Sequence, residues 1–253
     1  MIAAYAYFVL CLAAGQMLRS ARYSTAQIVQ RDADPLVRKH RRFYAPILIR
    51  VGDPLIALLD TGVQILPQRD WEKREREIYR TLYDRSIGVD GDGTLVLPCL
   101  TGETLATLLD RHNLEECARK WVIERAVIAL AHFHRLGFTH GDAMAENVMV
   151  DAGVARWFDF ETVHDAHRPM AWRRADDLRA LIVTCLVRTE PEKRAETLAF
   201  ILDVYADQDI TQALATSFTS VWRRSLAFHL AQARLSFQSF QAIARLLRER
   251  VAV

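Results

Sequence analysis

The segment FTHGDAMAENVMVDAGVARWFDFE, residues 138–161, decides the fold of this 253-residue chain. Asp142 and Asn147 lie five residues apart in a stretch without helical periodicity, so both side chains can point from one loop into one site. Two short strands, NVMVD and ARWFDF, follow and are joined by a turn. The second strand ends at Asp159, which the hairpin brings back beside the first loop.

These converging side chains suit a hard divalent cation. Two carboxylates and one amide oxygen are ligands that Mg²⁺ prefers, and this ion is usually shared with the phosphates of a substrate. Asp142 beside His140 can also hold a general base near a hydroxyl nucleophile. The alternative interpretation is a polar hairpin without a site, in which Phe158 and Phe160 are core residues only.

The same segment resembles the catalytic loop and metal-binding strand of the protein-kinase-like superfamily, H-x-D-x-x-x-x-N followed by D-F-G. The resemblance implies that Asp142 orients the acceptor hydroxyl, with His140 beside it in the catalytic loop. It implies that Asn147 and Asp159 bind Mg²⁺ and that Phe160 supports the loop. ATP and Mg²⁺ are the cofactors that follow from it.

Flanking segments extend the resemblance. LAHFHRLGFTHGD is similar to the helix end that leads into the catalytic loop, and TLVLPCLTGETLATLL is similar to the fifth strand, hinge and next helix of a kinase. This implies that adenine bonds the backbone at Pro98, Cys99 and Leu100. RRADDLRAL resembles the start of the helix whose aspartate braces the loop, and Asp177 fits that place better than Asp176.

A kinase also needs a lysine on its third strand for the α- and β-phosphates, and a helix glutamate to hold that lysine. Lys39, in PLVRKH, is one of only four lysines among 33 basic residues and is the residue expected in this role. The alternative is a solvated cation among neighbouring arginines. Glu77, in EREIYRTL, is the expected partner of Lys39, and Glu75 is the alternative.

The amino-terminal part departs from the family pattern. The distance between the lysine and the glutamate implies an insertion around residues 43–66. If the third strand is instead PLIALLD, residues 54–60, it contains no lysine. The expected phosphate loop, near residues 17–25, has no glycine, so serine and threonine N–H groups would have to meet the phosphates.

Three further departures indicate the branch of the superfamily. The loop has H-G-D in place of H-R-D, and Met144 stands where Ser/Thr kinases place a lysine. The stretch from Glu161 to Asp177 is too short for a full activation segment with its peptide platform. H-G-D is similar to aminoglycoside phosphotransferases, choline kinases, RIO-like kinases and lipopolysaccharide-core kinases, and D-F-E resembles choline kinases. An atypical or small-molecule kinase is therefore expected.

The distribution of elements predicts an α+β, two-lobed kinase-like fold. Strands gather in the first hundred residues, and helices are predicted over residues 70–84 and 115–136 and through most of the remainder. We expect a small β-rich N-lobe over residues 19–98 and a larger helical C-lobe over residues 99–253, with the catalytic loop at 139–161.

Composition sets the remaining limits. The chain is 51% hydrophobic and 25% charged, which is typical of globular proteins, and its net charge of +2 gives no electrostatic reason to expect a nucleic-acid partner. Its four cysteines form no C-x-x-C pair, so neither a zinc site nor a disulfide framework is expected, and a cytoplasmic location is favoured.

Residues 1–18 carry no charge and are interpreted as a core element, an extension before a start at Met17, or a membrane contact.

Together these features predict an ATP–Mg phosphotransferase that moves the γ-phosphate to a hydroxyl acceptor. The acceptor can be a small molecule, a glycolipid sugar or a protein serine. Two alternatives stay open: a pseudokinase or nucleotide-binding scaffold, and a membrane-associated lipopolysaccharide or lipid kinase.

Overall fold

The computed structural model describes residues 24–31, 34–43, 45 and 62–219, and three single positions, 242, 245 and 249. Its fold is α+β, with about half of it helical and with small antiparallel sheets. The apolar start, the expected phosphate loop before residue 24, the strand alternative at 54–60 and most of the proposed insertion lie outside the described residues. None of the helices in the described ranges is both long and apolar enough to span a membrane.

A four-stranded antiparallel sheet has the order β1-β2-β5-β4. Its strands are β1 (Ser24–Arg31), β2 (Asp34–Arg41), β5 (Leu95–Pro98) and β4 (Gly88–Val89). β1 and β2 form an antiparallel hairpin. Lys39 pairs with Leu95 and Val37 with Leu97, so these four side chains share one face of the sheet. Leu95 and Leu97 are buried, and Lys39 is therefore turned to the inner face.

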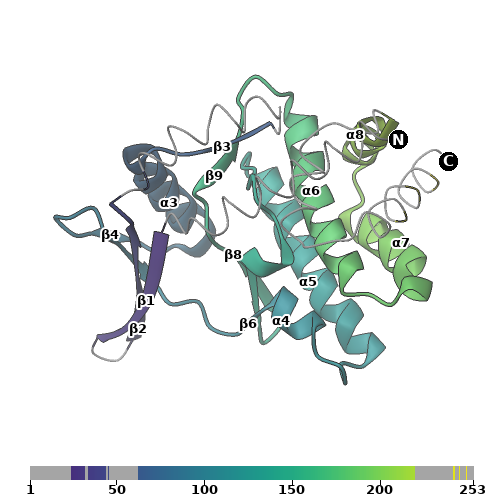
Figure 1. Ribbon diagram of the computed structural model, residues 1–253, viewed down its shortest axis with the longest axis horizontal. Helices are drawn as coiled ribbons and strands as arrows, with labels where there is room; N and C mark the ends of the chain where they lie inside the picture. The colour runs from purple at the N-terminus through teal and green to yellow at the C-terminus, as the bar shows by residue number, and fades with distance from the viewer. Residues whose placement is uncertain are drawn as a thin grey trace.

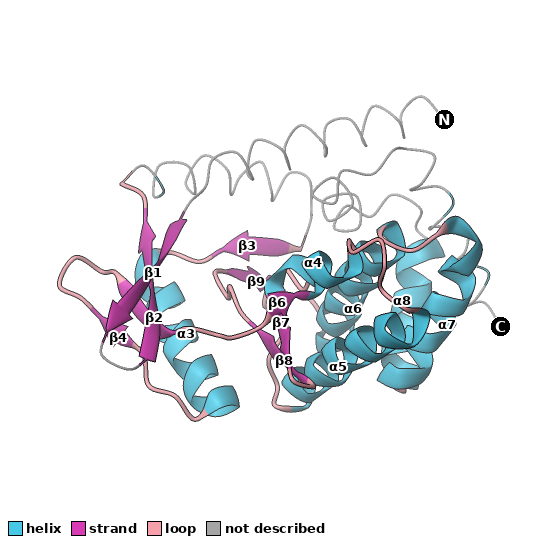
Figure 2. Cartoon of the chain, turned by 90° about the horizontal axis from the view of Figure 1, so that it is seen from below, coloured by secondary structure: helices cyan, strands magenta, loops and turns pink. Residues whose placement is uncertain are grey.

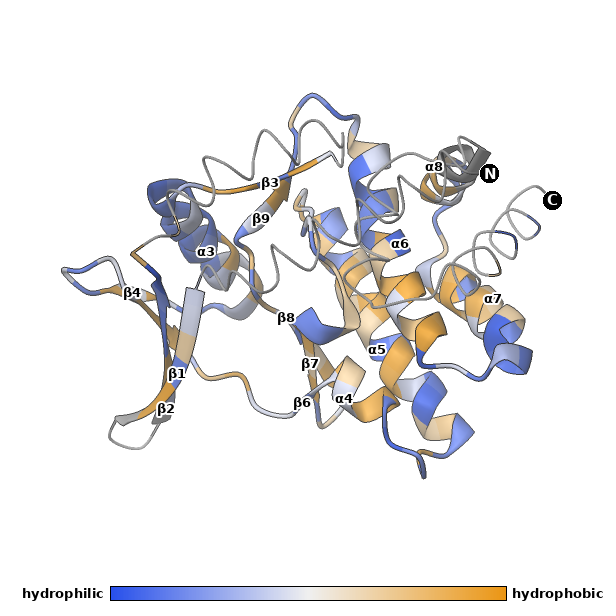
Figure 3. Ribbon diagram, in the orientation of Figure 1, coloured by the Kyte–Doolittle hydropathy of each residue, from blue (hydrophilic) through white to orange (hydrophobic). Residues whose placement is uncertain are grey.

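Helix α3 (Gln68–Tyr83) lies beside this sheet and matches the helix predicted over residues 70–84 (Figure 1). Its buried side chains are Trp71, Glu75, Ile78 and Tyr79. They recur at helical spacing and form one stripe, while the rest of the helix surface is hydrophilic (Figure 3). The carboxylate of Glu75 thus lies within the buried stripe of the helix.

The remaining helices lie together on the other side of the molecule from the four-stranded sheet (Figures 1 and 2). A three-stranded sheet, β6-β7-β8, and a two-stranded sheet, β3-β9, lie between these helices and the four-stranded sheet. The strands are β6 (Glu103–Thr104), β7 (Val148–Asp151), β8 (Val154–Trp157), β3 (Val63–Ile65) and β9 (Thr162–His164). The helices are α4 (Leu105–Leu109), α5 (Glu116–Arg135), α6 (Met170–Val187), α7 (Arg194–Tyr205) and α8 (Gln208–Thr219), with short 3₁₀ turns η1 (Ala145–Asn147) and η2 (Pro191–Lys193).

One contiguous apolar core joins these parts. It runs from Trp71 and Leu95 through Leu130 and Phe160 to Leu214, all of them buried. Hydrophobic residues gather where α5, α6 and α7 meet (Figure 3). The predicted helix over residues 115–136 is confirmed as α5, and its inward face carries the apolar residues that step at helical spacing.

Candidate active site

The end of α5 directs the chain into the candidate catalytic loop. Gly137 has a φ of +88°, and its N–H donates to the carbonyl of His134 at 3.0 Å. The N–H of Phe138 reaches back to the carbonyl of Phe133 at 3.3 Å, and the two phenyl rings stack with centroids 5.4 Å apart. This is a Schellman cap with its hydrophobic contact, and glycine supplies the left-handed residue that it needs.

Two adjacent aspartates of α6 take different partners. Asp177 accepts hydrogen bonds from the N–H groups of His140 at 2.7 Å and Gly141 at 2.8 Å. Asp176 instead forms an ion pair with Arg179 at 2.9 Å. The structure therefore places Asp177, rather than Asp176, directly beneath the loop, where the sequence leads one to expect the brace.

Asp177 is held in its charged form although it is buried. Burial alone would raise its pKa, but His164 and His134 oppose this and bring the pKa down to about 2. Nε2 of His134 lies 3.0 Å from Oδ2 of Asp177. The charged carboxylate of Asp177 makes its hydrogen bonds with the N–H groups of His140 and Gly141 stronger, which stabilises this conformation of the loop.

His140 does not face an acceptor. It is fully buried, and burial lowers its pKa to about 4, so the imidazole is neutral near pH 7. Its Nε2 lies 3.0 Å from the carbonyl oxygen of Phe158, and its Nδ1 accepts the N–H of Asp142 at 3.3 Å. The ring packs in the core and ties the loop to Phe158, directly after β8 (Val154–Trp157), while a catalytic role of His140 stays a prediction.

Gly141 explains the H-G-D sequence. Its φ is +82°, and a Cβ placed on it would lie 3.0 Å from the backbone carbonyl of Thr162 and from the carbonyl carbon of Val163. The loop passes so close to β9 that no larger residue fits without moving backbone. An arginine in this place, as in an H-R-D loop, would strain the left-handed backbone and require the chain at Thr162 and Val163 to shift by a few tenths of an ångström.

Asp142 and Asn147 meet, as their spacing predicts. The amide nitrogen Nδ2 of Asn147 donates to the backbone oxygen of Asp142 at 2.8 Å and to its carboxylate oxygen Oδ2 at 2.9 Å. The N–H of Ala145 donates to the hydroxyl of Thr184 at 3.0 Å, which anchors η1 on α6. These bonds leave Oδ1 of Asn147 as the acceptor atom of that amide.

Asn147 also connects the loop to the segment after β8 that carries Asp159. The N–H of Phe158 donates to the carbonyl of Asn147 at 3.0 Å. Asp159 follows directly and has a φ of +69°, a left-handed conformation that aspartate tolerates better than most residues. Backbone geometry of this kind is concentrated at functional sites.

Lys39 lies among carboxylates from distant parts of the chain. Its Nζ donates to Oδ1 of Asp159, 120 residues further on, and lies 3.7 Å from Glu75 and 3.9 Å from Glu161. Burial would lower the pKa of Lys39, but Asp159, Glu161 and Glu75 together raise it above its ordinary value. For Asp159, the charge of Lys39 outweighs burial and lowers the pKa. The alternative of a solvated lysine is wrong, because only 7% of Lys39 is exposed.

The glutamate beside Lys39 is Glu75 and not Glu77. Glu77 is exposed on the outer side of α3, whereas Glu75 is fully buried. Glu75 accepts hydrogen bonds from the indole of Trp71 at 3.1 Å and from the N–H of Phe160 at 3.4 Å. A signal in the sequence could have found it: Glu75 lies four residues after Trp71 and three before Ile78, and thus on the apolar stripe, which Glu77 does not share.

Phe160 is completely buried, as its supporting role requires. Its ring packs on Phe133 and His140, with centroids 5.5 Å and 5.0 Å away. Through its N–H it also contacts Glu75, so this one residue connects α3, α5 and the loop.

Glu161 has a role that the sequence pattern did not assign. Its carboxylate lies 3.8 Å from Arg41 and accepts a hydrogen bond from the hydroxyl of Ser24 at 3.2 Å. Burial raises its pKa to about 7; Lys39 opposes this shift and Asp159 adds to it. The D-F-E sequence therefore brings a third carboxylate to the lysine.

The expected adenine segment offers fewer donors than its length suggests. Pro98 has no N–H, and the N–H of Cys99 donates to the carbonyl of Pro35 at 3.1 Å. Of the three residues named for this role, Leu100 keeps an N–H that makes no bond within the described chain.

The site has the donor chemistry of a magnesium site shared with a ligand. No group of three or more His, Cys, Asp or Glu side chains arranged for a metal occurs among the residues that the structure describes. Asp159 and Oδ1 of Asn147 nevertheless supply two hard oxygen donors, and the backbone bond from Phe158 to Asn147 ties together the segments that carry them. Mg²⁺ typically takes one or two protein ligands and completes its shell with phosphates and water, so this pair fits it.

Comparisons with known proteins leave the family open. No family model matches the chain, and no curated protein matches it. A solved structure of the bifunctional kinase-methyltransferase WbdD is similar, with 18% sequence identity and a TM-score of 0.46. The match covers 93% of this chain and 49% of that one, so the chain spans about half the length of that protein.

Proposed function

We propose that this chain is a two-lobed, protein-kinase-like phosphotransferase that uses Mg-ATP and a hydroxyl acceptor. The observation that carries the proposal is the position of Lys39, buried between Glu75 and Asp159 beside the loop that holds Asp142 and Asn147. The four-stranded sheet with α3 would be the smaller lobe, and α4 to α8 with their strands the larger.

The charges around Lys39 favour a cation and phosphates as ligands. Two cations, Lys39 and Arg41, face three carboxylates, those of Glu75, Asp159 and Glu161. These oxygen-rich surroundings suit a divalent ion held by Asp159 and Oδ1 of Asn147, which would neutralise charge on the transferring phosphoryl group. Lys39 would pair with phosphate oxygens, and Glu75 would keep it pointing there.

Asp142 is the residue that we assign to the acceptor. It is half-buried at the start of the loop, and Asn147 fixes one of its carboxylate oxygens. A carboxylate held in one rotamer can accept the proton of a hydroxyl and orient its oxygen toward the phosphorus. The N–H of Leu100 would meet the adenine.

The acceptor that we favour is a small molecule or a sugar hydroxyl rather than a protein side chain. Only residues 165–169 separate β9 from α6, so there is little chain to form a platform for a peptide. A glycolipid sugar at a membrane surface fits this requirement as well as a soluble compound does.

The test is ATP turnover by the purified chain with Mg²⁺. Asp159→Ala should lower phosphate release or transfer about a hundredfold or more, because it removes a charge that acts on the transferring group. Asp203→Ala is the matched control, since Asp203 is exposed on α7. An unchanged rate in Asp159→Ala would sink the metal assignment.

A nucleotide-binding scaffold without transfer is the second candidate. The observation in its favour is the direct bond between Lys39 and Asp159, which neutralises the metal-binding carboxylate in this structure. A scaffold would show thermal stabilisation by ATP and no turnover. At a ligand concentration of 100 times Kd, binding adds about 2.7 kcal/mol to stability.

A further inference from the structure

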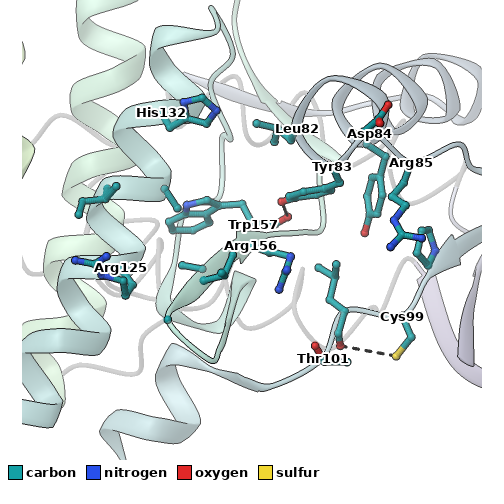
Figure 4. Close-up of a pocket in the computed structure, with 18 of the residues that line it drawn as sticks. Leu82, Tyr83, Asp84, Arg85, Cys99, Thr101, Arg125, His132, Arg156 and Trp157 are labelled. Carbon is teal, nitrogen blue, oxygen red and sulfur yellow. Dashed lines mark hydrogen bonds between the residues drawn. The ribbon is translucent and has the colours of Figure 1, made fainter. Parts of the chain in front are cut away.

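A cavity of about 1090 Å³ opens beside the segment that joins β5 to β6. Its walls come from the end of α3, residues 98–101, the outward side of α5 and the turn between β7 and β8 (Figure 4). Residues 98–100, the segment that we assign to adenine, form part of its lining, whereas Lys39, Asp142, Asn147 and Asp159 do not. The volume is that of a small-molecule site.

The charged groups of this cavity are mostly cationic. Arg85, Arg125 and Arg156 line it with His132, against one carboxylate, Asp84. Figure 4 shows Arg156 in the middle, with α5 on one side and the end of α3 on the other. Within the described part of the chain Arg85 and Arg156 form no ion pair, and Arg125 pairs only with the adjacent Glu124, at 2.8 Å.

The cavity also contains a buried hydrogen-bond donor, the indole N–H of Trp157. Trp157 lines the cavity and is 1% exposed, and its indole Nε1 has no hydrogen-bond acceptor among the residues that the structure describes. Buried N–H groups are rarely left unpaired, so such a group indicates a missing acceptor. The apolar walls include Leu82, Ile128 and Val154, and the last two are 41% and 47% exposed.

We infer that this cavity is a second ligand site, which shares the wall formed by residues 98–100 with the proposed nucleotide site, for a small organic anion with an apolar body. Guanidinium groups pair well with carboxylate or phosphate, and the indole N–H supplies a further donor. Apolar walls around a few polar groups are typical of small-molecule sites.

The position of the cavity connects it to the proposed active site. Trp157 stands two residues before Asp159 on the same strand end, and Tyr83, whose hydroxyl donates to the carbonyl of Trp157, is at the end of the helix that carries Glu75. A ligand that holds these groups together would change the affinity for Mg-ATP, and Mg-ATP would change its affinity by the same factor.

The experiment uses a matched pair of fluorescent probes: the anion 8-anilinonaphthalene-1-sulfonate and the neutral N-phenyl-1-naphthylamine. The full chain should bind the anion saturably at one site and about tenfold more tightly than the neutral probe. Arg156→Gln should remove that preference, and Arg125→Gln is the second variant if the first does not fold. Arg80→Gln, an exposed arginine of α3 outside this cavity, should bind as the wild type does.

Three results would overturn the inference. They are equal affinities for the two probes, an unchanged preference in Arg156→Gln, and strictly competitive displacement of the anion by Mg-ATP, which would place the probe in the nucleotide site. A saturating shift in affinity at high Mg-ATP supports two coupled sites. Since the readout is binding, a failure of ATP turnover would leave this result unaffected.

Discussion

Lys39 is the residue on which the account depends. It is one of four lysines in the chain, it is almost fully buried, and carboxylates from α3 and from the segment between β8 and β9 surround it. A buried ammonium is costly unless it is paired and hydrogen-bonded. The burial of Lys39 therefore depends on the carboxylates around it, and the site is organised around this ion-paired lysine.

Glu75 and Glu77 provide a matched pair of variants on one helix. Glu75→Gln should lower kcat/KM for ATP by about tenfold to a hundredfold, because the charge that orients Lys39 is lost. Glu77→Gln should stay within about twofold, since an exposed carboxylate contributes little. Steady-state kinetics of both variants checks this. Equal effects of the two changes would contradict the assignment of Glu75.

The catalytic loop, its flanking hairpin and the position of Lys39 could be predicted from the sequence, because their signals are local. Asp142, Asn147 and Asp159 are fixed by spacing along one segment, and turn and strand patterns surround them. Glu75 was the alternative to Glu77, and its place on the apolar stripe of α3, which Glu77 does not share, is the signal that favours it. The contact of Glu161 with Lys39 joins segments 122 residues apart, which no local pattern can reveal.

At the scale of elements, the loop is held by close approach and by capping. α5 ends in a glycine cap, Asp177 of α6 binds two N–H groups of the loop, and β9 passes against Gly141. Arg74 of α3 also donates to the carbonyl of Thr139. Four separate elements thus determine where Asp142 lies.

Three glycine-to-alanine changes separate these contributions. Gly91→Ala should alter the free energy of unfolding by less than about 0.5 kcal/mol, because the site is open and its φ is not left-handed. Gly137→Ala should cost about 1 kcal/mol, since it has space but a φ of +88°. Gly141→Ala should cost more than about 2 kcal/mol, because strain and the contact with Thr162 add. Urea unfolding measures all three, and a different order would contradict the close approach of β9.

At the scale of the whole molecule, α6 is the central support. Most of its side chains are buried, including Asp176, Asp177 and Arg179, and it packs on α5, α7 and α8. The same helix thus stabilises both the fold and the loop of the candidate site. Protonation of groups under the loop, such as Asp177, should therefore lower the free energy of unfolding of the whole molecule.

Acid should act on stability through groups that oppose one another above pH 4. The pKa of His140 is about 4 when folded against an ordinary 6.5, so this group contributes a loss of about 3 kcal/mol as pH drops from about 6.5 to 4. Glu161, whose pKa is raised to about 7, contributes a gain as pH drops from about 7 to 4.5, because its folded form binds the proton more tightly. Asp177, with its pKa lowered to about 2, adds a further loss below about pH 4.

The contribution of His140 belongs to one side chain and can be removed. His140→Phe should lower stability at pH 7 and, compared with the wild type, lose the destabilisation that falls between pH 6.5 and 4, because the proton uptake by His140 on unfolding is removed. His112→Gln, at an exposed position, should keep the slope. Urea unfolding at a series of pH values gives both slopes. A wild-type slope in His140→Phe would show that another group causes this loss of stability.

The claim that Lys39, Asn147 and Asp159 form a site for Mg-ATP is tested most directly by calorimetric titration with ATP, in Mg²⁺ and in EDTA. It needs no acceptor and no turnover. The wild type should bind about tenfold or more tightly with Mg²⁺, and Asp159→Asn should lose that difference. The same affinity with and without Mg²⁺ in the wild type, or an undiminished Mg²⁺ effect in Asp159→Asn, would contradict it.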